Sequence, residues 1–227
     1  MISSDLLILK ESRKAAIQSS PLFNRELDLN RNELTFIFSQ YWHLLTYFPN
    51  FLAYLITVLP RLSDKSSVAR VLSEELGDGN LEEAHEGAYF GALKLLGIDE
   101  NQVRSSVPLP KTQSMMSGYY SCANEPLKAL GFFLSTEFAD LWIVSNLGRL
   151  MLNALPERQT IKWIDLHVKQ EPGHVADAND CLGWISTPDD HNRVTSHAQE
   201  CARLWDDFFL GIYEEIESAR KKLTTVI

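Results

Sequence analysis

The sequence predicts an all-α protein: a single domain, residues 1–227, folded as one bundle of about seven or eight helices. Apolar residues recur at spacings of three and four along most of the chain, as they do on the buried face of a helix. No stretch shows the alternation of apolar and polar residues that is typical of a half-buried strand. No repeat, low-complexity tract or linker rich in Pro, Gly or Ser divides the chain, which favours one core rather than two.

The first half of the chain is expected to contribute four helices. The apolar spacing places them at about residues 4–19, 31–59, 64–76 and 80–96. Pro49 interrupts the second of these patterns, because proline lacks the backbone donor that a helix interior needs. Gly77 and Gly79 end the third helix. Asn80 is a suitable N-cap for the fourth, and Glu83 stands three residues later, where a capping-box acid belongs.

The second half is expected to contain four more helices after a loop. Pro108 and Pro110 mark this loop, which covers residues 99–111. Helices at about residues 112–122, 126–154, 157–180 and 191–222 follow. The stretch at 126–154 is apolar nearly all round, which predicts a central helix that is buried on every side.

The composition is that of a soluble globular protein and argues against several classes of partner. Lys and Arg number 21 and Asp and Glu number 30, so the formal net charge is −9. Nucleic acid and anionic membranes repel such a chain, and its longest membrane-like stretch, between Pro49 and Pro60, is too short to span a bilayer. The N-terminus lacks the basic lead and long apolar core of a signal peptide. The three cysteines have no Cys-x2-Cys spacing, so we expect a cytoplasmic protein without a disulfide framework or a zinc ribbon.

A single carboxylate breaks the apolar pattern of the central helix. Glu137 lies in the stretch FFLSTEFADLW, where its helical neighbours are typical core residues. A buried carboxylate is costly unless it is protonated, paired or bound to a metal. Taken alone, Glu137 is explained equally well by a buried arginine or hydroxyl partner.

Three potential metal ligands share one face of a later helix. His167, Glu171 and His174 lie at positions i, i+4 and i+7 of the sequence HVKQEPGH, and one stripe of a helix brings such positions together. A polar surface helix would give the same pattern. Pro172 and Gly173 within the motif disfavour a regular helix, so we expect this segment to be kinked or to become ordered when a metal binds.

The acidic stretch EELGDGNLEEAH adds two more potential ligands, although acidic runs are usually solvated surface. Glu75 and His85 flank its glycines. With Glu137 and the HVKQEPGH motif, they make three histidines and three carboxylates. Mixed nitrogen and oxygen ligands suit iron or manganese better than a structural zinc ion, which recruits thiolates. Glu82, three residues before His85, is interpreted as a residue behind the ligands or as an exposed acid at a helix N-terminus.

Together these residues resemble a known family. The sequence ELGDGNLEEAH, then Glu137, then the spacing His-x3-Glu-x2-His are similar to the haem-oxygenase-like di-iron oxidases and oxygenases. Relatives in that group are CADD and the fatty-acid decarboxylase UndA and, more distantly, PqqC and TenA. The aromatic stretch QYWHLLTYFPNFLAYL also resembles the second helix of that superfamily. The resemblance covers roughly residues 35–180 and implies a haem-oxygenase-like bundle.

The resemblance also implies a set of metal ligands. Residue by residue, the family's six ligands match Glu75, His85, Glu137, His167, Glu171 and His174. Glu171 stands where the family more often has Asp, and Pro172 and Gly173 separate the last two ligands. Some relatives take a further carboxylate from the second helix, but this chain has Phe48, Pro49 and Asn50 in that region.

The implied function is that of a non-haem enzyme that activates O2 with two Fe2+ ions per chain, or with manganese in their place, and without haem. The implied reaction is oxidative C–C or C–N cleavage, decarboxylation or nitrogen oxidation of a small amino acid or fatty acid. The partners are then a small-molecule substrate, O2 and an external reductant. A homodimer is one oligomeric state that the sequence leaves open. Two alternatives stay open. One is a metal-independent enzyme of the PqqC or TenA kind, with His and Glu as acid–base groups; the other is a non-catalytic binding or interaction module on the same fold.

Further residues are candidates for the substrate pocket or for a layer behind the ligands. These are Glu82, Tyr41, His43, Tyr47, Tyr89 and Asp177. The aromatic ones are expected mainly as core residues, and His43 as a packed, hydrogen-bonded histidine. Cys122 would suit the nucleophile of a TenA-like thiamin hydrolase, but the tyrosine expected four residues later is absent. We therefore expect Cys122 to be dispensable for activity.

Overall fold

The computed structural model describes residues 4–122, 124–157 and 159–225, and within them the chain is all-α, as predicted. These residues form nine α-helices and two short 3-10 helices and no strand. The α-helices are α1 (Ser4–Gln18), α2 (Arg31–Val58), α3 (Leu62–Glu75), α4 (His85–Leu95), α5 (Glu100–Arg104), α6 (Pro110–Tyr120), α7 (Pro126–Ala154), α8 (Lys162–Asp180) and α9 (Pro188–Thr225). The 3-10 helices are η1 (Pro21–Phe23) and η2 (Cys181–Trp184).

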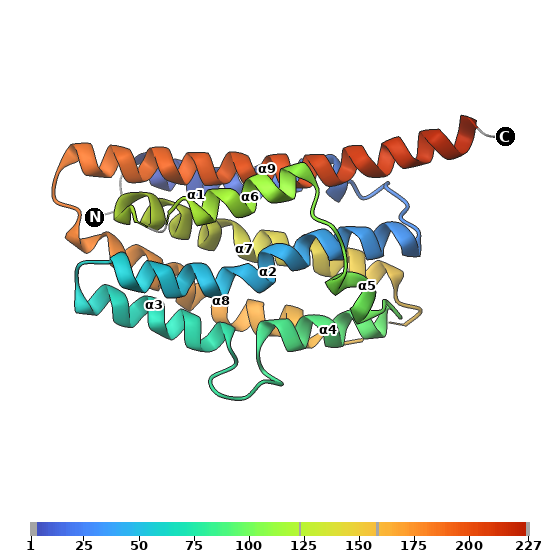
Figure 1. Cartoon of the computed structure of the whole chain (residues 1–227), viewed down its shortest axis with the longest axis horizontal. Helices are drawn as coiled ribbons and strands as arrows, with labels where there is room; N and C mark the ends of the chain where they lie inside the picture. Colours follow the sequence, from blue (N-terminus) through green and yellow to red (C-terminus); the bar gives the residue numbers. More distant parts are fainter. Residues whose placement is uncertain (1–3, 123, 158, 226–227) are drawn as a thin grey trace.

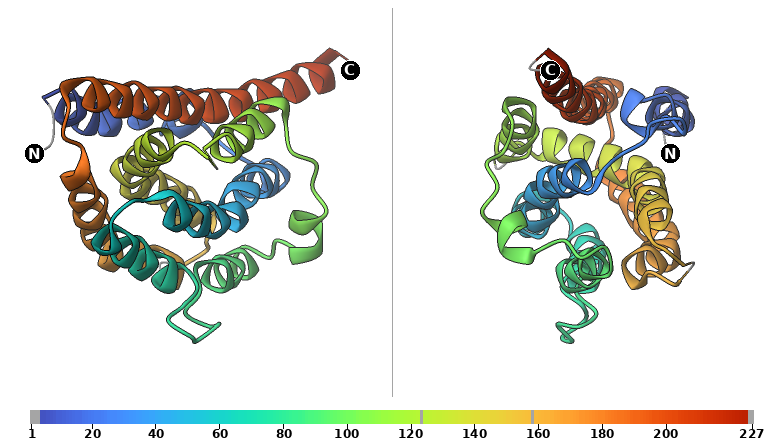
Figure 2. Two further views of the ribbon diagram at one scale, coloured as in Figure 1. Left: turned by 60° about the vertical axis from the view of Figure 1, so that its left-hand side comes forward. Right: turned by 90° about the vertical axis from the view of Figure 1, so that its right-hand side faces the viewer.

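Helix α7 is the centre of the bundle. It packs against α1, α2, α8 and α9, and most of its side chains are buried, as its apolar sequence predicts. The long helix α9 runs along one side of the molecule with α1 beside it, and α3, α4 and α8 lie on the opposite side of α7 (Figures 1 and 2). A polar side chain on the α8 side of α7 is therefore held deep between helices.

The backbones of α7 and α9 approach closely at a glycine. A Cβ atom at Gly131 would lie 2.7 Å from the carbonyl oxygen of Val194 and 2.9 Å from the backbone nitrogen of Ala198. Neither atom can move without shifting a helix. The glycine therefore sets the distance between the two longest helices of the bundle.

Replacing Gly131 with alanine is expected to lower the free energy of unfolding by about 1–3 kcal/mol, since the overpacking outweighs the better helix propensity of alanine. The matched control is Gly91→Ala on α4, where an added Cβ meets no atom within 4 Å and stability should rise by about 1 kcal/mol. Urea denaturation measures both. Equal stabilisation by the two substitutions would contradict the close approach of α7 and α9.

The structure differs from the predicted helices in four places. Helix α2 continues through Pro49, and α8 continues through Pro172, because packing on neighbouring helices offsets one missing backbone hydrogen bond in each. The predicted loop at 99–111 contains the short helix α5, whose N-cap Asp99 accepts a hydrogen bond from the backbone of Gln102. Helix α4 begins at His85 rather than near residue 80.

The reason for the late start of α4 is a turn around Asn80. The Asn80 side chain accepts a hydrogen bond from the backbone of Glu82 at 3.1 Å, so it caps a turn and not the helix. Lys162 then donates to the carbonyl oxygen of Glu82 and to the carboxylate of Glu83. These bonds hold the residues before His85 in a non-helical conformation against the start of α8.

Among the residues that the structure describes, no helix combines the length and the apolar character needed to cross a membrane.

Candidate metal centre

The turn between α3 and α4 brings the first two candidate ligands together. Glu75 is the last residue of α3 and His85 the first of α4, and Glu75 Oε2 lies 2.7 Å from His85 Nδ1. Gly77 makes this possible, because its φ of +82° is unfavourable for other residues and an added Cβ would collide with the carbonyl oxygen of Asn80. The glycine break predicted from the sequence thus folds an acid back onto a histidine.

Helix α7 supplies two carboxylates to the same place. Glu137 is 3% exposed, and one helical turn later Asp140 presents a side chain that is 16% exposed. Residues three apart lie on one face of a helix, so both carboxylates point from α7 toward α8. Asp140 was not among the predicted ligands, although its spacing from Glu137 within a buried helix was a readable signal.

Helix α8 places its three predicted residues on one buried stripe. His167, Glu171 and His174 are 3%, 2% and 1% exposed. The regular helix through Pro172 keeps them in register, because positions i, i+4 and i+7 fall on one face. The helix is continuous through Pro172 and Gly173, and this continuity places the three side chains beside Glu137 and Asp140.

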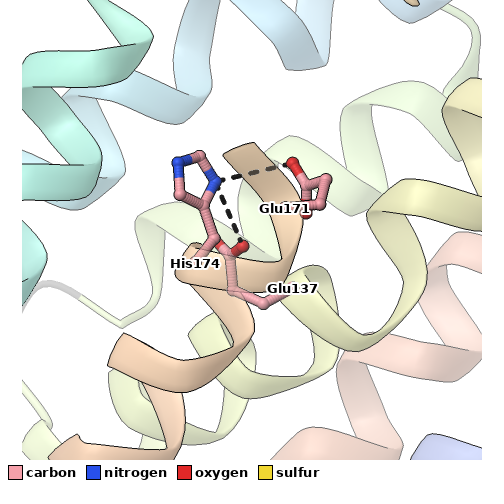
Figure 3. A group of neighbouring side chains, drawn as sticks. All are labelled: Glu137, Glu171 and His174. Atoms are coloured by element: carbon pink, nitrogen blue, oxygen red, sulfur yellow. Dashed lines mark ion pairs between the residues drawn. The ribbon is translucent and has the colours of Figure 1, made fainter. Parts of the chain in front are cut away.

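Two groups of donor atoms result, and they share one residue. The first contains Glu137, Glu171 and His174, and the second Asp140, His167 and Glu171; within each group the donor atoms lie within 4.8 Å of one another. In the first group His174 Nδ1 lies 3.5 Å from a carboxylate oxygen of Glu171 and 3.6 Å from one of Glu137 (Figure 3). Since Glu171 belongs to both groups, its two oxygens can serve two neighbouring ions.

Each histidine is oriented by a partner on its far nitrogen. The Nδ1 atom of His167 lies 2.7 Å from the carbonyl oxygen of Trp163, which leaves Nε2 facing Asp140 at 3.6 Å. His174 Nε2 lies 3.0 Å from Glu74, and His85 Nε2 lies 2.9 Å from the side-chain oxygen of Gln170. Such partners fix the ring and tautomer of metal-binding histidines.

We expect the Gln170→Ala variant to fold normally and to bind ferrous ion about 10-fold more weakly, because loss of a partner behind a ligand usually costs 10–100-fold in affinity. Its partner His85 would keep its place in the site but lose its fixed orientation. The neighbouring substitution Lys169→Ala is the control, because Lys169 is exposed on the other side of α8. Competition with a chromophoric chelator measures both affinities; equal affinities would mean that Gln170 does not position His85.

Electrostatics in the centre favour protonated carboxyls and one charged histidine. Burial, reinforced by the negative charge of Asp140, raises the pKa values of Glu137 and Glu171 well above the usual range. Burial also raises the pKa of Asp140 to about 6. These shifts are expected where several acids share a space with little water.

The histidine closest to Glu75 behaves differently from its neighbour. Burial opposes charge on His85, but the charge and hydrogen bond of Glu75 outweigh it and raise the His85 pKa to about 9. The same pair lowers the pKa of Glu75 despite burial. Burial and the neighbouring charge of His85 lower the pKa of His167 to about 3. His167 is therefore neutral at physiological pH and able to donate its Nε2 lone pair to a metal.

The donor set fits a divalent transition metal. Glu137 Oε1 and Glu171 Oε2 are buried and have no hydrogen-bond partner among the described residues, which is costly unless a proton or a cation compensates them. The nearby donors are imidazole nitrogens and carboxylate oxygens, a combination that suits iron or manganese. None of the three cysteines lines the cavity at the centre.

That cavity is small and has an apolar wall. It measures about 30 Å3, which has room for about two water molecules. Glu75, His85, Glu137, Asp140, His167 and Glu171 line its polar side, and Tyr41, Leu44, Leu45, Phe48, Tyr119, Thr136 and Trp205 line the rest. A bulky substrate cannot lie inside it in this conformation.

The structure separates the remaining predicted pocket residues. Tyr41 lines the cavity, whereas His43 faces Ser106 and Tyr47 packs against Tyr119 and Tyr120, so neither lines it. Tyr89 lies behind Tyr41 and donates its hydroxyl to the carbonyl oxygen of Phe38. These residues form the aromatic core around the centre, as their spacing in the sequence already suggested.

The two acidic candidates also differ. Glu82 is exposed in the turn before α4, because Lys162 holds that turn at the surface, and it is not behind a ligand. Asp177 is buried and forms an ion pair with Arg70, which also binds Glu74 at 3.3 Å. Since Glu74 contacts His174, Arg70 connects Asp177 to the centre. No local signal in the sequence identifies Glu74, Arg70 and Gln170, because their contacts join residues far apart in the chain.

Cys122 lies away from the centre. It is buried, its thiol donates to the carbonyl oxygen of Gly118, and burial raises its pKa to about 12. A nucleophilic cysteine needs a lowered pKa. The structure therefore offers no activation for Cys122, and its dispensability for activity stays a prediction.

The sequence matches one family model. Residues 36–206 match a model described as "iron-containing redox enzyme". The matched range contains every residue of both donor groups. No curated protein sequence matches the chain.

Solved structures with the same fold cover nearly the whole chain. A CADD-like protein of unknown function from Nostoc punctiforme has a TM-score of 0.78 at 13% identity, over 94% of this chain and 99% of that one. A domain of unknown function with a heme oxygenase-like fold from Shewanella denitrificans has a TM-score of 0.75 at 17% identity, over 94% and 92%. A TenA homolog from Pseudomonas syringae has a TM-score of 0.73 at 12% identity, over 92% and 91%. The predicted haem-oxygenase-like fold is thus confirmed.

Proposed function

Because the chain belongs to the family of iron-containing redox enzymes, we propose that it binds two ferrous ions and uses O2 to oxidise a small organic acid. The observation that carries this proposal is the position of Glu171 in both donor groups. A carboxylate between two groups of ligands is the arrangement that di-iron carboxylate proteins build between bundle helices. Glu75 and His85 complete the set of candidate ligands on the side of α3 and α4.

The seven side chains would divide between two ions. Glu137 and His174 would hold one, Asp140 and His167 the other, and Glu171 would contact both. The pair of Glu75 and His85 lines the same cavity and would have to separate to ligate. Ferrous ions, when bound, supply the electrons with which O2 is reduced.

The chain's own residues would prepare the site for that chemistry. The bonds from the histidines to Trp163, Glu74 and Gln170 hold each ring with its other nitrogen beside a carboxylate of the centre. The apolar wall of Leu44, Leu45 and Phe48 keeps bulk water from the reacting atoms. Burial keeps the Tyr41 pKa far above its usual value, so this tyrosine stays protonated beside the carboxylates.

The substrate class and the electron balance complete the proposal. We propose a small amino acid or fatty acid as substrate, with any electrons that the substrate does not supply coming from an external reductant. The cavity of about 30 Å3 admits O2 but not a chain of several carbons, so the substrate would approach from outside the donor groups.

Anaerobic loading with ferrous ion tests the proposal. We expect about two irons per chain, the stoichiometry of a two-metal site, together with a rise in the melting temperature. Oxygen uptake is then recorded across a panel of amino acids and fatty acids, and a substrate should raise it.

The same experiment separates the alternatives. Turnover without bound metal would favour an acid–base enzyme in which the buried His and Glu residues transfer protons. A protein that neither binds metal nor turns over any substrate would instead be a binding or interaction module. Either outcome would overturn the di-iron proposal.

A further inference from the structure

An open cleft runs along the surface between α1, α7 and α8, next to the donor groups. Its volume is about 370 Å3, within the usual range of small-molecule sites. Its lining comprises Lys10, Glu11, Lys14, Glu137, Phe138, Leu141, Trp142, Glu171, Pro172 and Val175. This cleft is separate from the small cavity on the aromatic side.

The floor of the cleft consists of two residues from the donor groups. Glu137 and Glu171 line both the cleft and the inner cavity. Their side chains are at least 97% buried, and each has one buried oxygen without a hydrogen-bond partner in the described part of the chain. A molecule in the cleft would therefore end within reach of the atoms proposed to hold iron.

Two lysines without ion pairs lie along the α1 side of the cleft. Lys10 and Lys14 are four residues apart, on one face of α1, and no carboxylate among the described residues forms an ion pair with either. Their ammonium groups lie 5.7 Å from the centre of the Phe138 ring and 4.6 Å from that of Trp142, respectively. Both ammonium groups thus lie over the apolar wall of the cleft, where Lys10 is half-buried and Lys14 stays exposed to solvent.

We propose that this cleft binds a small organic carboxylate, with its carboxylate between Lys10 and Lys14 and its carbon chain directed along Phe138 toward Glu137 and Glu171. As a substrate site it rests on the proposed function, but binding itself does not require iron. The walls formed by Leu141 and Val175 suit an aliphatic chain. A carboxylate matches the two cations that the acidic protein presents here.

The local charge in this cleft favours an anionic ligand over a cationic one. The lining contains one negative side chain on α1, Glu11, and two positive ones, Lys10 and Lys14. The net charge of −9 makes the chain as a whole repel anions, so a local pair of lysines is the feature that can attract one. The apolar walls further favour an anion with a carbon chain over a small inorganic anion, which gains nothing from them.

Calorimetric titration of the full-length protein tests the cleft directly, with hexanoate as the probe, in the metal-free and in the anaerobically iron-loaded state. Hexan-1-ol, hexylamine and sulfate are the comparison ligands. Hexanoate should bind in both states and more tightly than all three. Its affinity should fall as salt increases, because the lysines are solvent-accessible.

Charge variants locate the binding. The double variant Lys10→Gln/Lys14→Gln should weaken hexanoate binding by about 10-fold, and Glu11→Gln should strengthen it by about 3-fold, as expected for nearby charges in partial contact with water. Lys94→Gln is the matched control, because Lys94 is exposed on α4 outside the cleft and its loss should leave binding unchanged.

Three results would overturn the proposal. The first is that hexan-1-ol or sulfate binds as tightly as hexanoate. The second is that the double lysine variant binds hexanoate as tightly as the wild type does. The third is that hexanoate binds only to the iron-loaded protein, whether or not the lysines are present. The last result would mean direct coordination by the metal. Failure of the di-iron proposal would appear separately, as wild-type protein that binds hexanoate but no iron.

Discussion

Iron binding at both positions is expected to fail when Glu171 is replaced by glutamine. Glu171 is the one residue common to the two donor groups, and a neutral amide is a much poorer ligand for a hard cation than a carboxylate. We expect the iron content after anaerobic loading to fall from about two per chain to well below one. Substrate-dependent O2 uptake should fall by about 100-fold or more, since loss of a mere partner behind a ligand already costs 10–100-fold.

Two further variants separate the groups. Glu137→Gln removes a ligand only from the group with His174, and Asp140→Asn only from the group with His167. Each is expected to leave about one tightly bound iron per chain, as one position of a two-metal site stays intact. Glutamine has nearly the shape of a protonated Glu171, so the metal-free variant should melt close to the wild type. Two irons retained by Glu171→Gln would contradict its shared position.

The metal-free protein is expected to lose stability as the pH rises from 6.5 to 8.5. The pKa of His85 rises on folding from its usual 6.5 to about 9, so the folded state binds more protons in this range. The stabilisation is complete below pH 6.5 and is lost as the pH approaches 9. The raised pKa values of Glu137 and Glu171 act in the same direction, because the folded state keeps those protons too.

The opposing group does not act in this range. The pKa of His167 falls on folding to about 3. Its effect on the free energy of unfolding therefore increases stability between about pH 3 and 6.5 and is constant above pH 6.5. One extra proton across two pH units corresponds to about 2–3 kcal/mol, or a fall of about 4–12 °C in the melting temperature of a chain of this size.

Ferrous ion should counteract this loss of stability. Metal binding displaces the protons from the carboxyls and from His85, so the affinity for iron rises with pH. The melting temperature of the iron-loaded protein should exceed that of the metal-free protein by more at pH 8.5 than at pH 6.5. Scanning fluorimetry in both states measures the two slopes. A metal-free protein that becomes more stable over this range would show that the buried groups are not protonated as described.

The helices and most of the candidate site could be predicted from the sequence, because both depend on local spacing. The period of three to four apolar residues identifies α7 as the central helix, and the same geometry places His167, Glu171 and His174 on one stripe. Pro49 and Pro172 were misleading, since their local cost is small beside the packing of a long buried helix.

How these elements face one another follows from the packing of the helices and could not be predicted from local spacing. Asp140 becomes part of the centre because α8 lies against its face of α7, and Glu74 and Gln170 orient histidines up to 100 residues away in the chain. The turn at Asn80 exposes Glu82, and the pairing of α1 with α7 places Lys10 and Lys14 above Glu137. Helical periodicity in the sequence indicates which side of a helix is buried. It does not state which helix covers that side, because that depends on packing among residues distant in sequence.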